Sequence, residues 1–403
     1  MTMTASPFAS VELAPRDPIL GVTETFNADA NPVKVNLGVG VYYDDGGKVP
    51  VLECVRRAEQ KLAETVRSRS YLPIDGIPAY NKAVQEVLLG AGHDAVKSGR
   101  AVTVQALGGT GGLKLGADFL RRFNPGAQVW ISDPSWENHR ALFEYAGFTV
   151  NAYPYYDAAT RGLNFGGMIQ ALQAIPGGSV VVLHACCHNP TGVDLAPEQW
   201  DQVVATVKSR GLVPFLDIAY QGFADGLDAD GVVVRRFAEA CPAVFVSSSF
   251  SKSLSLYGER VGALSIVTGG ADEAARVLSQ LKRVIRTNYS NPPTHSGQAV
   301  TSVLTTPELR QLWEQELGQM RERIKLMRRQ LVDRIRAQRA DFDFSFVIRQ
   351  RGMFSYTGLS REQVIRLQKE YGIYAVDTGR ICIAALNSRN IDHVAKAIAA
   401  VLV

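Results

Sequence analysis

The segment Ala243-Val244-Phe245-Val246-Ser247-Ser248-Ser249-Phe250-Ser251-Lys252-Ser253 joins an apolar run to a cluster of hydroxyl side chains around one lysine. Arg260 follows in Leu256-Tyr257-Gly258-Glu259-Arg260-Val261-Gly262. Hydroxyl groups and a guanidinium together suit a phosphate. A lysine amine held away from water beside other cations has a lowered pKa and can attack a carbonyl. Pyridoxal 5'-phosphate carries both an aldehyde and a phosphate, so the segment predicts this cofactor. The alternative is a surface lysine after a strand, and the rest of the chain has to decide.

Short apolar runs alternate with helix-like segments through the middle of the chain. Their apolar residues are nearly continuous, which is typical of strands covered on both faces by helices. The clearest runs are 128–132, 179–185, 212–216, 243–247 and 262–267. Helical patterns lie between them, for example over 111–123 and 197–209. This alternation predicts an α/β domain with a mostly parallel sheet sandwiched by helices.

The pattern changes after this domain. Over 307–336 apolar residues recur at spacings of three and four, which predicts one long amphipathic helix. Short strands near 343–347 and 381–384 and a final helix from Ile391 would follow it. The Pro- and Gly-rich segment 11–50 is expected to pack with this second, smaller α+β domain, which is then built from both termini. We predict three parts: an N-terminal arm with part of the small domain over 1–49, a large cofactor-binding domain over 50–310, and a connecting helix with the small domain over 311–403.

Composition narrows the class of protein. The 403 residues are 46% hydrophobic and 20% charged, with a net charge of +4 that is scattered along the chain. Such a weak charge argues against nucleic acid as the main partner. Five cysteines form no disulfide framework by their number and spacing, which favours a reducing, cytoplasmic location. We see no signal peptide, and no apolar run is long enough to span a membrane.

Two segments place polar groups where strands are expected to end. Gly108-Gly109-Thr110-Gly111-Gly112 follows the apolar Val102-Thr103-Val104 and precedes a helix, where bare N–H groups favour an anion. A simple turn is the alternative. Asp217 ends the run 212–216, and Tyr220 follows it. Ligands collect at the carboxyl ends of parallel strands, and a carboxylate there can pair with a pyridinium nitrogen. A helix N-cap is the alternative for Asp217.

The segment His184-Ala185-Cys186-Cys187-His188-Asn189-Pro190-Thr191-Gly192 is rich in potential metal ligands. Alternate residues of a strand point to opposite faces, so these side chains cannot converge, and we predict no metal. A cis Asn189-Pro190 bond in a tight turn would instead aim Asn189 at a ring hydroxyl.

Three isolated residues complete the set of candidates. Trp136 follows a strand and offers a flat surface for a ring, or else packs in the core. Arg380 and Arg286 offer guanidinium groups, the natural partners of carboxylates, although each alone reads as a surface arginine.

Taken together, these segments resemble the fold-type I aminotransferases of subgroup Iα, the aspartate and aromatic (tyrosine) aminotransferases. The resemblance runs in the same order from Asp17-Pro18-Ile19-Leu20 to the last helix. The matching motifs are Ser-Phe-Ser-Lys252, Cys-Cys-His-Asn189-Pro-Thr-Gly, Asp217-Ile-Ala-Tyr220-Gln-Gly-Phe, Gly-Glu-Arg260-Val-Gly and Asn-Tyr-Ser-Asn-Pro-Pro.

The resemblance implies a role for each candidate. Lys252 would hold pyridoxal phosphate covalently and then move the substrate α-proton. Asp217 would pair with the pyridine nitrogen, supported by His139. Tyr220 and Asn189 would contact the ring O3′, with Trp136 against the ring. The phosphate would be held by Gly109, Thr110, Ser249, Ser251 and Arg260, with Tyr71 reaching in from the other subunit.

The resemblance also implies the substrates and the assembly. Arg380 would bind the α-carboxylate of an amino acid, and Gly40 would line the same site. Arg286 of the neighbouring subunit would meet a side-chain carboxylate, so the enzyme would be a homodimer acting on amino acids and 2-oxo acids.

Several segments lean towards the aromatic branch of the family. They are Gly40-Val41-Tyr42-Tyr43, Tyr71-Leu72-Pro73, Ser132 to His139 and Gln350 to Gly358. Thr110 and Asn291 are aspartate-type choices, and Ser70 departs from the leucine of the aromatic pattern. We therefore expect an aminotransferase of Phe and Tyr that also accepts Asp and Glu, with 2-oxoglutarate as acceptor, cycling through pyridoxamine phosphate. The alternatives are an aspartate aminotransferase with little aromatic activity, a lyase or decarboxylase on the same scaffold, and a regulator with an inactive domain.

Overall fold

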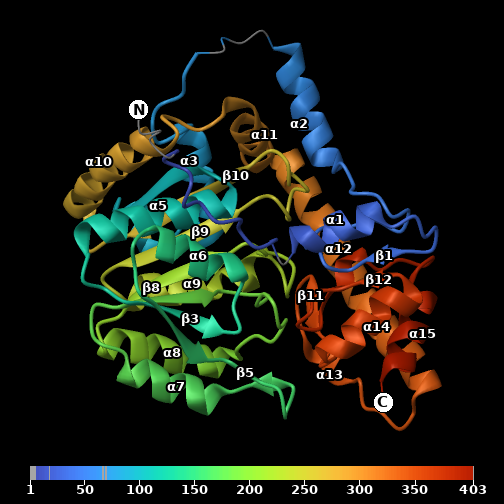
Figure 1. Cartoon of the computed structure of the whole chain (residues 1–403). Helices are drawn as coiled ribbons and strands as arrows, with labels where there is room; N and C mark the ends of the chain where they lie inside the picture. Colours follow the sequence, from blue (N-terminus) through green and yellow to red (C-terminus); the bar gives the residue numbers. More distant parts are fainter. Residues whose placement is uncertain (1–5, 18, 66–67, 69, 403) are drawn as a thin grey trace, which may run out of the picture.

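The computed structural model describes all residues except 1–5, 18, 66–67, 69 and 403. A large body with a twisted central sheet lies beside a smaller body that contains the C-terminus (Figure 1). Within the described residues no helix is long and apolar enough to cross a membrane.

The central sheet has seven strands in the order β2-β10-β9-β8-β7-β3-β4. Strand β10 runs antiparallel to both of its neighbours, and the other pairings are parallel. The prediction of a mostly parallel sheet is therefore confirmed. The strands are β2 (Ala101–Leu107), β3 (Val129–Asp133), β4 (Val150–Pro154), β7 (Val180–His184), β8 (Val213–Ile218), β9 (Val244–Ser249) and β10 (Val261–Val267).

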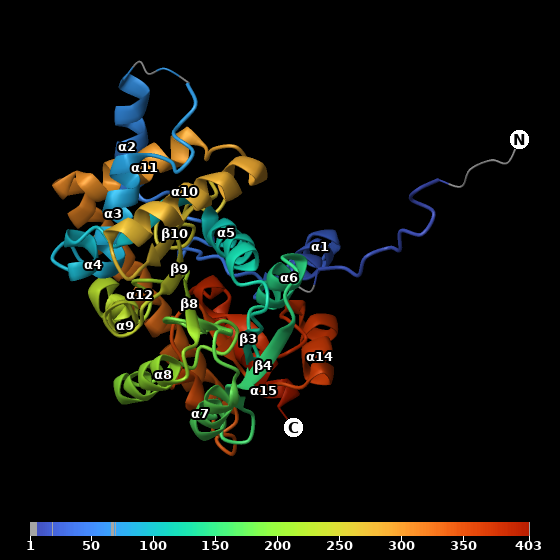
Figure 2. The same cartoon turned by 90° about the vertical axis from the view of Figure 1, so that its left-hand side faces the viewer.

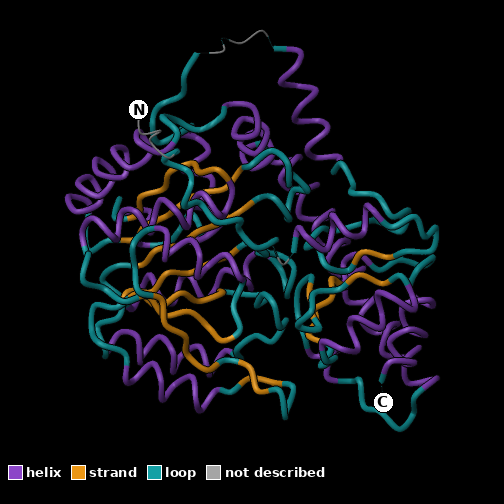
Figure 3. The backbone as a smooth tube through the Cα atoms, in the orientation of Figure 1, coloured by secondary structure: helices purple, strands orange, loops and turns teal. Residues whose placement is uncertain are grey.

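Helices cover both faces of this sheet (Figure 3). In β7, Val180 and Val182 face one hydrophobic cluster and Val181 and Leu183 face the other. Burial on both faces explains why the strand sequences are continuously apolar. One face is covered by α5 (Gly108–Phe123), α6 (Glu137–Tyr145) and α10 (Ala271–Asn288). The other is covered by α3 (Pro78–Leu89), α8 (Pro197–Ser209), α9 (Leu227–Ala240) and α11 (Thr294–Thr305).

The remaining elements of the large body are short or peripheral. They are α2 (Glu53–Glu64), α4 (Asp94–Lys97), α7 (Phe165–Ala174) and the β5–β6 hairpin (Tyr156–Asp157 and Gly162–Leu163).

The smaller body joins the two ends of the chain. Strand β1 (Val35–Asn36) pairs in parallel with β12 (Ile373–Tyr374), and β11 (Phe354–Tyr356) pairs antiparallel with β13 (Arg380–Cys382). A small α+β unit built from both termini is thus confirmed, while the boundaries at 49/50 and 310/311 stay a prediction. Its helices are α1 (Leu20–Ala28), α13 (Phe346–Arg349), α14 (Arg361–Tyr371), the 3-10 turn Ile383–Ala385 and α15 (Ile391–Val401).

The expected strand at 343–347 is wrong. The Asp343 carboxylate accepts a hydrogen bond from the Ser345 amide at 2.8 Å, and α13 starts directly afterwards. Phe344 and Phe346 are both buried, with ring centroids 5.2 Å apart. The alternation of Phe344 and Phe346 resembles a strand in the sequence, but in the structure the two residues belong to a turn and to the start of α13. The strand expected at 381–384 is β13, which ends at Cys382 and continues into the 3-10 turn.

The long helix α12 (Pro307–Gln338) confirms the predicted connecting helix. It packs against α2 and α11 on one side and against α13 and α15 on the other. Its fully buried Trp313 donates an indole hydrogen bond of 2.7 Å to the carbonyl of Ser253, next to Lys252. The helix thereby supports the loop that carries the candidate lysine.

Replacing Trp313 with Phe should destabilise the protein by roughly 1–3 kcal/mol, because the buried Ser253 carbonyl loses its donor. Denaturant unfolding of the purified protein measures this. Leu326→Ala is the control on the same helix, since Leu326 is 42% exposed, and should change stability by less than about 0.5 kcal/mol. Equal effects of the two changes would contradict the supporting role of Trp313.

Candidate active site

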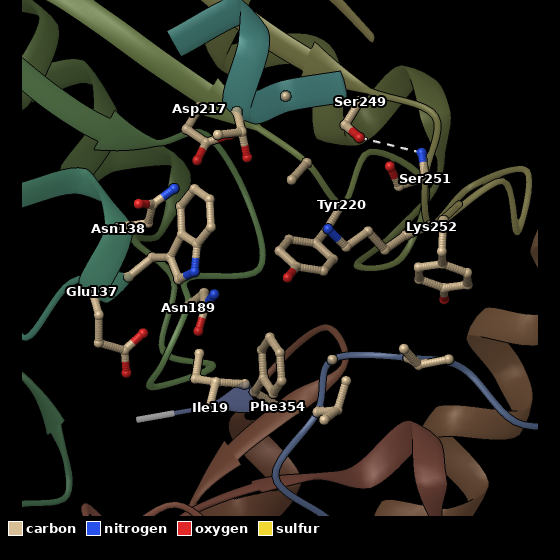
Figure 4. A pocket seen from close by; sticks show the side chains of 18 of the residues that line it. Ile19, Glu137, Asn138, Asn189, Asp217, Tyr220, Ser249, Ser251, Lys252 and Phe354 are labelled. Carbon is tan, nitrogen blue, oxygen red and sulfur yellow. Dashed lines mark hydrogen bonds between the residues drawn. The ribbon is translucent and has the colours of Figure 1, made fainter. Parts of the chain in front are cut away.

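A cavity of about 770 Å³ opens where the carboxyl ends of the parallel strands meet the smaller body. Figure 4 shows Lys252 reaching in from one side, towards Tyr220, with Asp217 on the opposite side and Phe354 below. The predicted site residues that line it are Gly40, Gly109, Thr110, Trp136, Asn189, Asp217, Tyr220, Ser249, Ser251, Lys252, Arg260 and Arg380.

Lys252 lies just beyond the end of β9, in the turn that the hydroxyl-rich segment forms. Its Nζ is 5.3 Å from the centroid of the Tyr220 ring. Removal from bulk water lowers the pKa of the Lys252 amine, and the charge of Arg260 acts in the same direction against the opposing charge of Asp217. A lower pKa leaves a larger fraction of the amine neutral and nucleophilic.

Asp217 lies within β8, so the N-cap alternative is wrong. Its Oδ2 is 2.9 Å from His139 Nε2, and His139 Nδ1 is 2.9 Å from the hydroxyl of Ser135. Burial acts to raise the pKa of the Asp217 carboxyl, but the hydrogen bond and charge of His139, with the charge of Lys252, outweigh it. The pKa therefore lies below its usual value, and Asp217 presents a carboxylate to the cavity.

The ring of His184 packs against the ring of His139. Burial lowers the pKa of His184 to about 3, which makes it neutral at ordinary pH. Ligand atoms of His139, His184 and Asp217 lie within 4.8 Å of one another, a spacing that a metal ion requires. The bond between His139 and Asp217 occupies the atoms that such an ion would need. The absence of a bound metal stays a prediction.

Glycines bring the start of α5 against the start of β10 and form a cup of donors. A Cβ atom on Gly262 would lie 2.5 Å from the carbonyl carbon of Gly108, so the two backbones touch there. Gly108 has a φ of +69°, and a Cβ on it would lie 2.5 Å from the Arg260 guanidinium. This contact brings Arg260 beside the first N–H groups of α5, where an anion is favoured.

Hydroxyl groups complete the cup. Arg260 Nη1 donates to Ser251 Oγ at 3.3 Å. The Ser251 amide donates to Ser249 Oγ at 3.2 Å (Figure 4). Gly109 and Thr110 line the same side of the cavity from the first turn of α5.

Arg380 is 1% exposed and lies at the start of β13. Its Nη1 donates to Asn189 Oδ1 at 3.0 Å and its Nη2 to the Gly38 carbonyl at 2.7 Å. Among the residues described, its buried Nε has no partner. The guanidinium lies 4.4 Å from the ring of Phe354. A buried guanidinium with an unused donor is suited to a ligand carboxylate.

Two further predicted residues also lie as the sequence suggested. The Asn189-Pro190 peptide is cis, and Asn189 points into the pocket in Figure 4. Trp136 directly precedes α6 and contacts His139 edge-on, with centroids 5.3 Å apart. It therefore lies between the cavity and the partner of Asp217.

Tyr71 and Arg286 lie outside this cavity. Tyr71 is 88% exposed. Arg286 is exposed on α10 and donates to the Ser290 hydroxyl. A single chain does not bring either of them to the site.

Sequence reasoning missed several lining residues. The tertiary fold brings Ile19, Leu20 and Phe354 together at the cavity, and no local pattern marks them as partners. A Cβ on Gly40 would lie 2.5 Å from the Phe354 ring, so the two pack closely. Tyr257 was findable by its closeness to Arg260, and its hydroxyl accepts a hydrogen bond from the Tyr42 amide at 2.9 Å. Glu137 and Asn138 follow Trp136 directly.

Comparison with known proteins places this fold and site in a family. The model of the family "Aminotransferase class I and II" matches residues 32–398, and the chain belongs to that family. It is 62% identical to the aspartate aminotransferase of Pseudomonas aeruginosa, covering 98% of this chain and 100% of the relative. It is 48% identical to the aromatic-amino-acid aminotransferase of Escherichia coli, again over 98% and 100%.

Solved structures agree with this assignment. The aromatic-amino-acid aminotransferase of Burkholderia pseudomallei, covalently bound to pyridoxal phosphate, superposes with a TM-score of 0.97 and 66% identity, covering 99% of this chain and 100% of that one. The chain is thus an aminotransferase, as the sequence predicts, and pyridoxal phosphate as its cofactor is confirmed.

The residues present fit that cofactor. The cup at Gly108 suits its phosphate, the buried carboxylate of Asp217 suits its ring nitrogen, and the Lys252 amine suits its aldehyde. The observation behind this fit is the close approach at Gly108, which leaves the first N–H groups of α5 and Arg260 facing the same space.

His139→Ala should make the protein more sensitive to acid. The lowered pKa of Asp217 stabilises the native state above the ordinary value of 3.8, and this contribution is lost as pH falls through the lower, folded-state pKa. Without His139, burial dominates and raises the pKa, so the loss should begin at higher pH. The midpoint of denaturant unfolding, followed from neutral to acid pH, measures it. His295→Ala, at a 53% exposed side chain, should leave the profile unchanged. An unshifted profile in His139→Ala would show that this hydrogen bond does not hold the charge of Asp217.

Proposed function

We propose that this chain transfers the amino group of Phe, Tyr, Asp and Glu to 2-oxoglutarate, and that the predicted site residues act in the roles given above. One observation carries the proposal. A single cavity holds an amine, a buried carboxylate, an anion cup and a partly unused guanidinium, contributed by Lys252, Asp217, Arg260 and Arg380.

Bound pyridoxal phosphate supplies an aldehyde and an electron-withdrawing ring. Lys252 would hold the cofactor through its amine, and the same amine would take the substrate α-proton and return it. Its lowered pKa serves both tasks, since a general base works best when its pKa lies near the operating pH. The Tyr220 ring beneath its Nζ limits where the amine can move.

Asp217 holds a proton on the ring nitrogen. His139 keeps the carboxylate charged, and Ser135 fixes the ring of His139 through its Nδ1. Tyr220 and Asn189 orient the ring through its hydroxyl oxygen.

Arg380 binds the α-carboxylate of the substrate and thereby places the α-carbon near Lys252. Its hydrogen bonds to Asn189 and Gly38 fix the guanidinium plane before the substrate arrives. Phe354, Ile19 and Leu20 add apolar surface that excludes water and suits an aromatic side chain.

We further propose that the enzyme is a homodimer with active sites at the subunit boundary. Tyr71 and Arg286 are exposed and lie outside the cavity of their own chain. This position supports a role in the active site of the partner subunit. Residues 6–17 lead away from the body beyond α1 (Figure 2) and expose Phe8, Val11 and Leu13. Apolar side chains on such an arm favour a covering surface on another chain.

The location and the domain division belong to the same proposal. All five cysteines are free and buried, which supports a reducing, cytoplasmic compartment. The division at 49/50 and 310/311 places Gly40, Phe354 and Arg380 on the smaller body, opposite Lys252 and Asp217.

A specific observation favours a second candidate, an aspartate aminotransferase with little aromatic activity. The Pseudomonas aeruginosa relative bears that name at 62% identity, while the Burkholderia pseudomallei structure bears the aromatic name at 66%. Initial rates on Phe and Asp separate the two.

Lys252→Ala should keep its fold and lose turnover by at least roughly 100-fold, because attachment and proton transfer share this one amine. Transamination rates and borohydride trapping of the cofactor measure the two roles. The exposed Lys208→Ala serves as the control and should behave as the parent. Turnover near that of the parent would refute the assignment of Lys252.

Arg286→Ala should lower the activity on the acidic substrates Asp and Glu alone. A substrate carboxylate buried in the site needs a cation, so kcat/KM for Asp and Glu should fall about 100-fold or more. An aromatic side chain needs no cation, so kcat/KM for Phe and Tyr, assayed with an aromatic 2-oxo acid, should change by less than about tenfold. A parallel fall for both classes would make Arg286 structural.

Mixed dimers test whether Arg286 acts across the interface. A dimer of one Lys252→Ala chain and one Arg286→Ala chain holds one doubly damaged site and one intact site. Dicarboxylate activity should return when the two inactive homodimers are mixed. No recovery in confirmed heterodimers would mean that Arg286 acts in its own chain or not at all.

A further inference from the structure

A second hollow lies on the far side of the turn that leads from α13 into β11. Its volume is about 390 Å³. Five of its lining side chains are basic and one is acidic: Lys325, Arg328 and Arg329 of α12, Arg349 at the end of α13, Arg351 of the turn, and Asp225. Their formal charge of +4 equals the net charge of the whole chain. We call this space the basic hollow.

Arg328 carries a buried charge that no described carboxylate meets in an ion pair, although the charge of Asp194 acts on it from farther away. It is 3% exposed. Its Nη2 donates to the carbonyls of Gly352 at 2.8 Å and Phe354 at 3.1 Å, and its Nε to Ser355 Oγ at 3.4 Å. Over the described residues its Nη1 has no hydrogen-bond partner and no carboxylate forms an ion pair with it. Burial lowers its pKa to about 10, so the guanidinium stays charged at neutral pH. Burial of a charge without a direct ion pair is costly.

Two more guanidinium groups at the hollow form no direct hydrogen bond or ion pair within the described residues, although Arg349 acts through its charge on Asp343. Arg329 and Arg349 are exposed and come from elements that face each other across the space. Neither side chain forms a hydrogen bond or ion pair with any residue that the structure describes. The other two cations are engaged, because Lys325 lies 3.3 Å from Glu322 and Arg351 pairs with Asp225. The unused donors are therefore those of Arg328, Arg329 and Arg349.

We propose that the basic hollow binds a small polyanion, a molecule that presents two or more anionic oxygens as phosphate or carboxylate groups. Arg328 Nη1 contacts it at the buried end, and Arg329 and Arg349 grip it at the rim. Planar guanidinium groups bind both kinds of oxyanion in pairs of hydrogen bonds. The volume of the hollow is that of a small-molecule site.

The shape of the site argues for a small ligand. Proteins that bind nucleic acid spread their cations over a face or along a helix. In this chain Arg328, Arg329 and Arg349 converge on one concave space.

The hollow and the active cavity share one wall. The Arg351 amide donates to the Gly192 carbonyl at 2.6 Å, three residues after Asn189. Arg328 holds the carbonyl of Phe354, whose ring contacts Arg380. A polyanion in the hollow therefore lies against the segment that ends at the substrate-binding arginine.

The probe for the test is inorganic pyrophosphate, titrated calorimetrically into the cofactor-loaded enzyme at constant ionic strength. We expect one binding event per chain in the parent. Arg329→Gln/Arg349→Gln should bind roughly tenfold more weakly or worse, since two charge-assisted hydrogen-bonding groups are lost. The matched control is Arg122→Gln/Arg276→Gln, which removes two exposed arginines elsewhere and should bind as the parent does.

Citrate in a second titration distinguishes the two sources of anionic oxygens. Tighter binding of pyrophosphate assigns the site to phosphorylated compounds, and tighter binding of citrate assigns it to polycarboxylates. Should the double variant fail to fold, Arg329→Gln and Arg349→Gln singly provide the same comparison.

Three results would overturn the proposal. The first is that the parent binds no pyrophosphate, and the second is that both double variants bind it equally more weakly than the parent. The third is that Arg329→Gln/Arg349→Gln binds it with the affinity of the parent, which would place the probe elsewhere, the active cavity included. Binding of heparin or duplex DNA without binding of either small probe would replace the small anion with a macromolecule.

Discussion

The parallel register of β7, β8 and β9 determines where the reactive groups of this chain lie. His184 pairs with Asp217 across β7 and β8, and Asp217 pairs with Ser247 across β8 and β9. Because the three strands run in the same direction, the residues that follow them emerge at one edge of the sheet. Asn189, Tyr220 and Lys252 belong to three separate loops and still face one cavity. A one-residue slip of β8 would turn Asp217 to the opposite face, away from His139.

The charges at this edge depend on one another. Asp217 and Lys252 each lower the energetic cost of the other's burial, and Arg260 partly offsets that balance. His139 lowers the pKa of the Asp217 carboxyl, which burial alone would raise. A neutral histidine, His184, packs against His139 with centroids 4.9 Å apart and brings no further charge. The cavity therefore holds one buried negative charge, that of Asp217, together with the positive charges of Lys252 and Arg260.

Much of this was predictable because the signals are local. Strands buried on both faces leave continuous apolar runs, and α8 begins and ends where its Pro and Ser residues predict. The hydroxyls, lysine and arginine of the cup lie within one short segment. The signals that failed are those that depend on the tertiary fold. The alternating Phe344 and Phe346 read as a strand at 343–347, but Asp343 turns the chain there. Ile19 and Phe354 reach the site from opposite ends of the chain, and no sequence pattern connects them.

In the proposed roles the smaller body contributes binding rather than bond-making groups, and this division has a structural cause. Arg380 forms hydrogen bonds with Asn189 of the large body and Gly38 of the N-terminal segment, so its position depends on both. The turn that carries Phe354 is held from behind by Arg328 of the long helix α12. That helix also supports the loop of Lys252 through Trp313. One helix thus contacts both the loop of Lys252 and the turn whose Phe354 packs on Arg380. Because it contacts both, a displacement of the turn relative to the helix changes the distance between Arg380 and Lys252, which is the distance that a substrate of fixed length must match.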